Sequence, residues 1–308
     1  MEKEILIFGH KNPDTDSICS AMVKERLNKK NGHESSVAVR LGNINKETQY
    51  VLNYLNLEAP ELKEEVAEGQ KVIMVDHNEF NQSIKGIEKA KILGVVDHHR
   101  IANFETSDPL YYTARPYGCT STILFQDFKG KGIEINREEA ILMASAIISD
   151  TLLLKSPTTT KHDEKALEEL EKIAGIDIKE YGLEMLKAGT DLDDFTAKEL
   201  INLDAKELDK NGIKFVIGQV NTVDIPSVLE RQEELEKAIE EELKEKELAL
   251  FVLAITDILN SNSEILVLGE KSSVVEKAFD KKLENNRAFL EGVVSRKKQL
   301  LPNIDKNI

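Results

Sequence analysis

Short apolar runs rich in valine and isoleucine alternate with helix-like segments through the first half of this chain. Four of these runs have the length of buried strands: residues 3–8, 36–41, 71–75 and 92–96. Three segments between them have helical patterns: residues 17–28, 46–54 and 81–89. Alternation of strand and helix predicts an α/β fold, in which a parallel sheet is covered on both faces.

A more helical part follows, with helices expected at residues 120–127, 137–148 and 163–173. Around residues 188–194 the regular pattern stops, and the sequence consists mostly of small and acidic residues. Such a composition is typical of a linker. We therefore expect the first domain to end close to this segment.

Beyond the linker, the alternation of strands and helices begins again. Strands are expected at residues 213–219 and 249–255, and a strongly charged helix over about residues 227–246 separates them. The sequence thus predicts two α/β domains, of which the second is the smaller. We assign them as follows: a first domain over residues 1–188, a linker at 189–194 and a second domain over 195–308.

The charge of the chain limits the partners that it can bind. Its 56 acidic residues outnumber its 41 lysines and arginines, which gives a formal net charge of -15. Long nucleic acids are bound mainly by neutralising their phosphates with lysine and arginine, so we expect no nucleic-acid partner. A small anion would need a bound metal or a local concentration of cations.

Other features favour a cytoplasmic protein. The chain has two cysteines, Cys19 and Cys119, which lie far apart and indicate neither a disulfide framework nor a cysteine metal site. The longest apolar run, residues 248–255, is far shorter than a membrane span. The acidic start of the chain is unlike a signal peptide. We therefore expect no membrane association.

Histidines and aspartates cluster just after the predicted strands. Four of the six histidines follow an apolar run: His10, His77, His98 and His99. Four aspartates accompany them: Asp14, Asp16, Asp76 and Asp97. The carboxyl ends of parallel strands share one edge of a sheet, where ligand sites gather. Three strands would therefore bring imidazole and carboxylate groups to one place.

A metal site is the simplest explanation of this cluster. Any one of these residues has an ordinary structural alternative, and Asp16, for example, is placed to cap the helix that follows it. Several carboxylates at one sheet edge, however, repel one another unless cations neutralise them. Carboxylates and imidazoles without thiolates favour Mn²⁺ or Mg²⁺ and tolerate Co²⁺ or Zn²⁺.

Sequence spacing suggests how these ligands are shared. Asp14 and Asp16 are two residues apart, so in an extended loop they would point the same way and serve two neighbouring ions. The adjacent His98 and His99 would project to opposite sides, one towards a metal and the other towards a substrate. Asp150, which ends the apolar stretch at residues 140–148, is a weaker candidate by itself.

Three motifs resemble the DHH phosphoesterase superfamily: residues 9–17 (GHKNPDTDS), 75–79 (VDHNE) and 96–100 (VDHHR). Further segments are similar to family II inorganic pyrophosphatases, which are manganese-dependent soluble enzymes: residues 149–151 (SDT), 155–158 (KSPT) and 295–299 (SRKKQ). The Asp-His-His motif indicates the superfamily, and the basic motif near the C-terminus is specific to the family.

This resemblance implies the fold and the site residues. The fold would comprise an N-terminal parallel-sheet DHH domain and a smaller C-terminal α/β domain of DHHA2 type, with the active site in the cleft between them. Six residues would bind metal, with Asp76 bridging two ions: His10, Asp14, Asp16, Asp76, His98 and Asp150. Four would bind the phosphates: His99, Lys206, Arg296 and Lys297. Three would orient the ligands: His77, Asn78 and Asp97.

The resemblance also implies the reaction. Two Mn²⁺ ions per subunit, about 3.5–4 Å apart, would share a hydroxide that attacks pyrophosphate and releases two orthophosphates. Co²⁺ or Mg²⁺ would substitute, and additional Mg²⁺ would accompany the substrate. Asp76 and His99 are the expected catalytic residues, with His99 protonating or orienting the leaving phosphate. The family resemblance implies a homodimer.

The basic motif would supply the cations that an acidic chain needs for an anionic substrate. Arg296 can hold a phosphate through two hydrogen bonds, and Lys297 acts as a point charge. The apolar stretch at residues 289–294 predicts that the motif lies at a strand end with its cations facing inward. Closure of the domains would then complete the site.

Two other functions are compatible with the metal motifs. An exopolyphosphatase, or a phosphodiesterase acting on short oligonucleotides or cyclic dinucleotides, would share the first domain with its Asp-His-His motif. The nuclease branch typically has a glycine-rich, histidine-containing motif in its second domain, which this sequence lacks, and 5% aromatic residues without tryptophan give few surfaces for base stacking. A non-catalytic metal-binding protein would have lost a ligand or the basic motif.

The first-domain motifs also follow one another too closely for an inserted regulatory nucleotide-binding module.

Overall fold

The computed structural model describes residues 4–210 and 212–308. The chain forms two compact units, the first ending at Gly189 and the second comprising Thr190–Ile308. Lys3, the first residue of the strand predicted over 3–8, lies outside the described residues. None of the described helices is both long and apolar enough to span a membrane.

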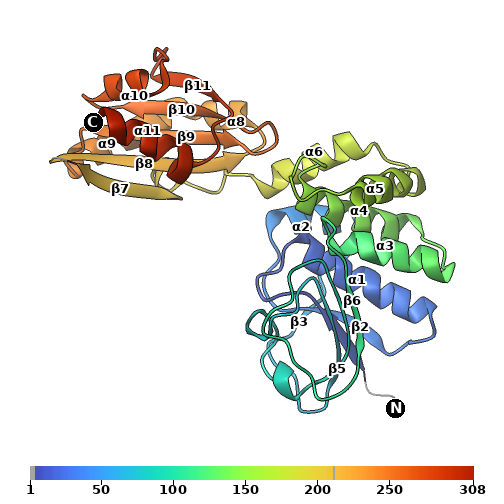
Figure 1. Cartoon of the computed structure of the whole chain (residues 1–308). Helices are drawn as coiled ribbons and strands as arrows, with labels where there is room; N and C mark the ends of the chain where they lie inside the picture. Colours follow the sequence, from blue (N-terminus) through green and yellow to red (C-terminus); the bar gives the residue numbers. More distant parts are fainter. Residues whose placement is uncertain (1–3, 211) are drawn as a thin grey trace. The chain divides into compact units, whose positions relative to one another are not determined.

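A parallel sheet of six strands forms the centre of the first unit (Figure 1). The strands run in the order β3-β2-β1-β4-β5-β6, and every neighbouring pair is parallel, as predicted. The strand order therefore changes direction between β1 and β4, the position at which open α/β sheets bind ligands. The strands are β1 (Ile5–Phe8), β2 (Ser36–Arg40), β3 (Glu61–Leu62), β4 (Lys71–Val75), β5 (Lys91–Asp97) and β6 (Tyr111–Ala114).

Helices cover one face of this sheet, where α1 packs against β1 and β2 as well as against α3 and α4. The α4 helix is apolar on all sides because α1, α3, α5 and α6 surround it. A capping box of Asn136 and Glu139 fixes its start. The helices are α1 (Thr15–Lys30), α2 (Lys46–Leu55), α3 (Thr120–Lys131), α4 (Arg137–Thr151), α5 (Lys161–Ala174) and α6 (Ile178–Gly189).

The helix predicted over residues 81–89 is wrong. This segment contains two short 3₁₀ helices, η1 (Phe80–Gln82) and η2 (Ile87–Lys89). Gly86 before η2 has a φ of 87°, and a Cβ there would lie 2.6 Å from the carbonyl oxygen of Val66, so the chain turns instead of continuing as a helix. Ile84 and Ile87 nevertheless pack against the apolar side chains on the other face of the sheet.

The second unit contains a mixed sheet of five strands in the order β11-β10-β9-β8-β7. The central pair β8 and β9 is parallel, and the other pairs are antiparallel. The strands are β7 (Ala205–Lys210), β8 (Ile213–Thr222), β9 (Leu250–Asp257), β10 (Asn262–Leu268) and β11 (Arg287–Glu291).

Helices lie on both faces of this second sheet (Figure 1). Alternate residues of β9 enter two cores: Phe251 and Leu253 pack with α7 and α9, whereas Leu250 and Val252 pack with α10 and α11. The helices are α7 (Ala197–Asn202), α8 (Ile225–Leu229), α9 (Gln232–Glu245), α10 (Ser272–Phe279) and α11 (Leu301–Asn307), the last preceded by the π-helical turn η3 (Arg296–Leu300).

Two predictions for this unit are corrected. The helix predicted over 227–246 is divided into α8 and α9, because Arg231 leaves the helical conformation and donates hydrogen bonds to the carbonyl oxygens of Leu192 and Phe195. The basic motif is not a strand end. The β11 strand stops at Glu291, and Arg296 begins η3, whose first turn is capped by the Ser295 hydroxyl.

Candidate metal centre

The predicted convergence at one sheet edge is confirmed. His10 lies two residues after β1, Asp76 directly follows β4, and Asp97 ends β5 just before His98 and His99. These three strands are neighbours in the sheet, and the change of strand order lies between the first two. The fold therefore places these side chains at the ligand-binding position of an open parallel sheet.

Asp76 occupies the centre of this cluster. Its φ is 59°, a left-handed conformation that costs a non-glycine residue about 1–2 kcal/mol and that aspartate tolerates better than most. Its buried carboxylate accepts hydrogen bonds from Ser17 Oγ at 2.8 Å and Thr120 Oγ1 at 3.2 Å, one on each oxygen. His10 Nε2 lies 3.5 Å from Oδ2, and His98 Nε2 lies 3.4 Å from Oδ1. Each carboxylate oxygen thus faces a different histidine.

One candidate metal group consists of His10, Asp14 and Asp76, whose ligand atoms all lie within 4.8 Å of one another. Asp14 is the N-cap of α1: its Oδ1 accepts a hydrogen bond from Ser17 N at 2.9 Å, and its Oδ2 lies 3.4 Å from His10 Nε2. The capping role suggested for Asp16 is therefore wrong. The extended loop expected through Asp14 and Asp16 is also wrong, because α1 begins at Thr15.

A second candidate group consists of Asp16, Asp76, His98 and Asp150, and a third, which overlaps it, consists of Asp76, His98 and His99, within the same 4.8 Å limit. Asp16 is fully buried and accepts hydrogen bonds from Thr120 N at 2.8 Å and Ser121 N at 3.3 Å, at the start of α3. Asp150 enters from the last turn of α4, and its Oδ2 lies 3.7 Å from His98 Nε2. Asp76 belongs to all three groups and is the one residue that the first and second share, so it can bridge two ions.

His98 and His99 do not project to opposite sides as expected. Their ring centroids are 4.2 Å apart, and His99 Nδ1 lies 3.8 Å from the same Asp76 oxygen that His98 approaches. The cause is Asp97, whose Oδ1 accepts hydrogen bonds from both the backbone N and Nδ1 of His99, at 3.1 and 2.9 Å. These bonds hold the His99 ring on the Asp97 side of the backbone. The His99 side chain is still half exposed.

The crowded charges shift the pKa values of the groups in this cluster. Burial and the charge of Asp16 raise the pKa of Asp76 to about 7. Burial opposes protonation of His98, but the Asp76 carboxylate and the charge of Asp16 outweigh it and raise the pKa of His98 to about 9. Burial and the charges of Asp16 and Asp76 also raise the pKa of Asp150 well above its usual value. The cluster therefore favours positive charge at its centre, whether as protons or as metal ions.

The donor set fits divalent metal ions. Asp150 Oδ2 is buried and accepts no hydrogen bond from any residue in the described part of the chain. His98 donates its Nδ1–H to the carbonyl oxygen of Tyr117 at 3.0 Å, so Nε2 is the ring nitrogen that faces the carboxylates and can bind a metal ion once deprotonated. Oxygen ligands with a few imidazoles are the set that Mn²⁺ and Mg²⁺ prefer.

The three residues expected to orient ligands are buried behind the cluster. His77 donates from Nδ1 to the Val75 carbonyl oxygen at 2.9 Å, and burial lowers its pKa to about 4, so it is neutral near pH 7. Asn78 donates to Asp97 Oδ2 at 2.6 Å. Burial opposes ionisation of Asp97, but hydrogen bonds from His99 and Asn78 outweigh it and lower its pKa. Asp97 is thus a fixed acceptor for His99.

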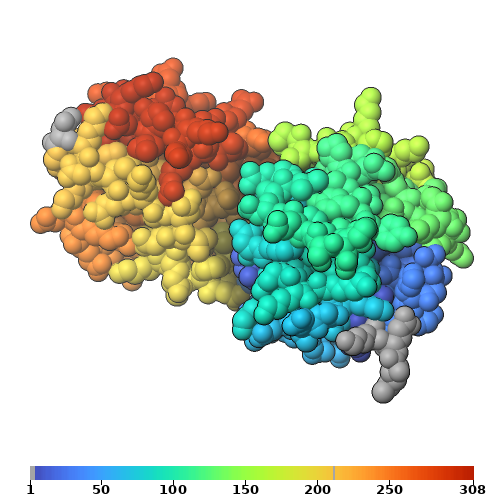
Figure 2. Space-filling model, turned by 60° about the horizontal axis from the view of Figure 1, so that its bottom comes forward, coloured from blue at the N-terminus to red at the C-terminus, as the bar shows by residue number. Residues whose placement is uncertain are grey.

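The predicted phosphate-binding residues other than His99 lie in the second unit. Lys206 is exposed on β7, and Arg296 and Lys297 begin η3. Arg296 contacts Asp204, with Nη1 2.5 Å from its carbonyl oxygen and Nη2 2.8 Å from its carboxylate, so it lies beside the start of β7. The C-terminal residues of the chain form part of the surface of this unit (red in Figure 2).

Sequence reasoning missed the residues that hold these groups in place. Ser17 and Thr120 bind Asp76. Gln219 on β8 accepts a hydrogen bond from Arg296 N at 3.1 Å and donates to the Val294 carbonyl oxygen at 3.0 Å. Serine and threonine at helix starts are ordinary caps, so their presence alone does not indicate a role in the site. Of these residues, only Ser17 lies within one of the motifs, at residues 9–17. No sequence pattern identifies Gln219.

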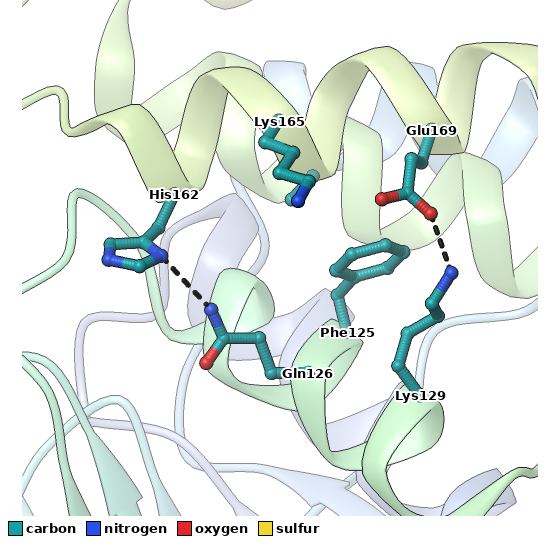
Figure 3. Close-up of a pocket in the computed structure, with 7 residues that line it drawn as sticks. Phe125, Gln126, Lys129, His162, Lys165 and Glu169 are labelled. Atoms are coloured by element: carbon teal, nitrogen blue, oxygen red, sulfur yellow. Dashed lines mark hydrogen bonds and ion pairs between the residues drawn. The ribbon is translucent and has the colours of Figure 1, made fainter.

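A separate pocket of about 240 Å³ between α3 and α5 contains none of the predicted site residues (Figure 3). In it Gln126 donates to His162 Nδ1 at 3.3 Å, and Lys129 pairs with Glu169 at 2.7 Å (Figure 3). His162 also stacks on Tyr117, whose carbonyl oxygen accepts the hydrogen bond from His98. The pocket therefore adjoins a support of the metal site but is not part of it.

Family models match both units. The model described as the N-terminal domain of the DHH family matches residues 4–147, and the DHHA2 domain model matches residues 183–307. A probable manganese-dependent inorganic pyrophosphatase of Staphylococcus carnosus is 57% identical over 298 residues, which are 97% of this chain and 97% of that protein. The manganese-dependent inorganic pyrophosphatase of Bacillus subtilis is 57% identical over 303 residues, covering 98% of this chain and 97% of that protein.

Solved structures show the same architecture. A crystal structure of a putative family II inorganic pyrophosphatase from Methanococcus jannaschii has a TM-score of 0.61 and 42% sequence identity, and the match covers 98% of this chain and 99% of that one. An exopolyphosphatase-related protein from Bacteroides fragilis, 13% identical with a TM-score of 0.50, matches 99% of this chain and 92% of that one. The second likeness concerns the fold alone.

Proposed function

The chain belongs to the family II, manganese-dependent inorganic pyrophosphatases of the DHH superfamily, and from this premise we propose that it hydrolyses pyrophosphate to two orthophosphates at a two-manganese site in its first unit. The identities of 57% to relatives named for this activity support the substrate. The observation that carries the proposal is that Asp76 is the one residue shared by two candidate metal groups, His10–Asp14–Asp76 and Asp16–Asp76–His98–Asp150. A single carboxylate with one oxygen facing each group is suited to bridging two ions.

Six side chains would hold the metal ions. One ion would be bound by His10, Asp14 and Asp76, and the other by Asp16, Asp76, His98 and Asp150. When bound, the two ions would neutralise the carboxylates, bind substrate oxygens and lower the pKa of a shared water so that hydroxide is available near neutral pH. The proposed metal is Mn²⁺, with Co²⁺ or Mg²⁺ as substitutes and additional Mg²⁺ bound with the substrate.

The remaining residues act on the substrate. His99 is fixed by the Nδ1–H bond to Asp97 Oδ1, so Nε2 is the atom from which it would donate a proton or a hydrogen bond to the leaving phosphate. Arg296 would bind a phosphate through two nitrogens, and Lys206 and Lys297 would add positive charge. His77 and Asn78 would keep the first unit's donors oriented.

Further expectations complete the proposal. We propose a cytoplasmic homodimer that binds pyrophosphate and neither nucleic acid nor membrane. The edge strand β6, on which the Tyr111 side chain is exposed, offers a sheet edge in the described part of the first unit that a second copy would cover. Mass measurement in solution would test the dimer, and the variant Tyr111→Lys should weaken it if β6 is the contact.

The products formed from three substrates, compared side by side, test the function: orthophosphate is measured for the first two and released nucleotides for the third. The substrates are pyrophosphate, polyphosphate and a short oligoribonucleotide, each with Mn²⁺, with Mg²⁺ or with a chelator. We expect rapid release from pyrophosphate with Mn²⁺, slower release with Mg²⁺, and none with the chelator. Faster hydrolysis of polyphosphate, or any cleavage of the oligoribonucleotide at a comparable rate, would contradict the proposed substrate.

A further inference from the structure

Glu47 connects two segments that bear metal ligands. Its Oε1 accepts a hydrogen bond from Thr15 Oγ1 at 2.6 Å and another from Ser149 Oγ at 2.5 Å. Thr15 stands between Asp14 and Asp16 at the start of α1, and Ser149 precedes Asp150 near the end of α4. One carboxylate oxygen on α2 thus holds together the residues adjacent to three proposed ligands.

The local role of Glu47 in its own helix does not explain these contacts. Glu47 lies in the first turn of α2, where an acidic side chain often stabilises the helix dipole. The N-cap of α2, however, is Asn45, whose side chain accepts the Thr48 N–H at 2.7 Å. Thr15 Oγ1 also lies 3.2 Å from Thr48 Oγ1, which fixes the hydroxyl that donates to Glu47. Glu47 therefore serves the neighbouring segments.

Its position bears on the spacing of the two metal groups. Asp14 belongs to one group, whereas Asp16 and Asp150 belong to the other. The carboxylates of these groups repel one another before any ion binds. A fixed link between the start of α1 and the end of α4 resists that repulsion and holds the two groups at a constant separation.

Gly189 packs directly on this link. A Cβ at Gly189 would lie 2.9 Å from Glu47 Cβ and 3.0 Å from Glu47 Oε2, closer than ordinary contacts allow. Gly189 is the last residue of α6 and of the first unit. A larger residue at this position would have to displace either the Glu47 side chain or the end of α6.

We propose that Glu47 is a positioning residue that sets the geometry of the two-manganese site by clamping Thr15 to Ser149, with Gly189 as the residue that keeps the clamp in place. This inference rests on the proposed function. Loss of such outer contacts typically weakens metal binding about 10- to 100-fold. The hydrogen bonds need an acceptor oxygen and no negative charge, so glutamine can replace glutamate.

Manganese titration of the metal-free protein, followed by electron paramagnetic resonance, tests the proposal. The signal distinguishes free Mn²⁺, single bound ions and a coupled pair, so it reports the geometry without turnover. We expect Glu47→Ala to bind Mn²⁺ about 10- to 100-fold more weakly and to lose the coupled-pair signal. Glu47→Gln should remain within about threefold of the wild type, since its carbonyl oxygen accepts the same bonds.

Two further variants keep the test valid if Glu47→Ala does not fold. Gly189→Ala changes a different helix and should reproduce the weaker binding by displacing Glu47. Ser149→Ala removes one of the two hydrogen bonds and should weaken Mn²⁺ binding less than Gly189→Ala does. Gln49→Ala, on the exposed side of the same helix, is the matched control and should bind like the wild type.

The outcomes separate this inference from the proposed function. A wild-type protein that binds no pair of Mn²⁺ ions contradicts the proposed function. A wild type with a coupled pair and a folded Glu47→Ala with unchanged affinity and signal overturns the positioning role. If Glu47→Gln weakens Mn²⁺ binding as much as Glu47→Ala does, the positioning role is also overturned. The effect would then come from the negative charge of Glu47 and not from its hydrogen bonds.

Discussion

The two units present their proposed functional residues in opposite ways. In the first unit the Asp16 and Asp76 carboxylates are buried and fixed by hydroxyl and backbone donors. In the second unit Lys206 and Lys297 are exposed, and Arg296 is held mainly through Asp204. Buried carboxylates need preorganised partners because their repulsion must be balanced. Cations that receive a small anion from water can stay accessible.

This difference predicts two classes of variant. Changes at the buried site should alter metal binding and turnover together. Changes in the exposed basic segment should alter substrate use and leave metal binding intact. A change in the basic segment that lowers metal binding, or a change at the buried site that alters only substrate use, would show that the two regions are not separate in function.

Asp76→Asn should have the largest effect. Both metal groups lose a charged ligand, and the several kcal/mol that metal ions contribute to catalysis correspond to about a thousandfold loss of kcat. Metal analysis of the purified variant should find fewer than two Mn²⁺ per chain. Asp108→Asn, an exposed aspartate of the same unit, is the control. Full metal occupancy in Asp76→Asn would rule out the bridge.

His99→Gln should lower kcat about a hundredfold if the imidazole protonates the leaving phosphate. The Asp97 hydrogen bond raises the pKa of His99 in the metal-free protein, so the protonated form persists to higher pH and kcat should fall as pH rises through that pKa. Asp97→Asn should move this fall to lower pH, and His99→Gln should abolish it. Profiles of kcat against pH check both, with the exposed His33→Gln as the control.

An unchanged pH profile in His99→Gln would leave His99 with a binding role alone. In that case KM would rise more than kcat falls. The kinetic effect of the His99 variant would then resemble that of variants at the cations of the second unit, although His99 lies in the first unit.

Arg296→Ala should reduce kcat/KM about 10- to 100-fold, the value of one or two hydrogen bonds to a charged group. Manganese content should stay at the wild-type level. Steady-state kinetics and metal analysis of the same preparation measure both quantities, and the exposed Lys281→Ala of the same unit is the control. Loss of manganese in Arg296→Ala would mean that this arginine supports the metal site instead of the substrate.

Gln219→Ala should have the smallest effect. It removes the acceptor of the Arg296 N–H and the donor to the Val294 carbonyl oxygen, which lie on either side of Ser295. A net hydrogen bond contributes about 1 kcal/mol, so we expect kcat/KM to fall about fivefold without a change in thermal stability beyond a few degrees. Lys214→Ala, exposed on the same strand, is the control. A larger loss of stability than of kcat/KM would indicate a purely structural residue.

The sequence predicts those parts of the fold that correspond to continuous runs of apolar residues. The long strands of the first sheet contain runs of apolar residues, such as residues 72–75, and the parallel sheet follows from their alternation with helices. Strand β7, with the sequence AKELDK, is charged and has no such run, so only its antiparallel pairing with β8 defines it. The turn at Gly86 likewise depends on close contact with Val66, which no local pattern shows.

The candidate site divides in the same way. The sheet-edge rule brings His10, Asp76 and His98 together from sequence alone. Asp150 lies on helix α4, and only the three-dimensional fold brings the end of that helix to the sheet edge. Its place in the site was therefore predicted from the family resemblance. The clamp formed by Glu47 was not predictable, because it joins residues 102 positions apart along the chain. The ligand roles themselves, and the domain limits at 188 and 195, stay predictions.

Crystallography with manganese tests the central claim most directly. Crystals grown with Mn²⁺ would be measured on both sides of the manganese absorption edge, so that anomalous peaks identify the metal. The account predicts two peaks, one on each side of Asp76, with the other ligands divided between them as His10 and Asp14 for one and Asp16, His98 and Asp150 for the other. A single peak, or two peaks that do not share Asp76, would contradict it.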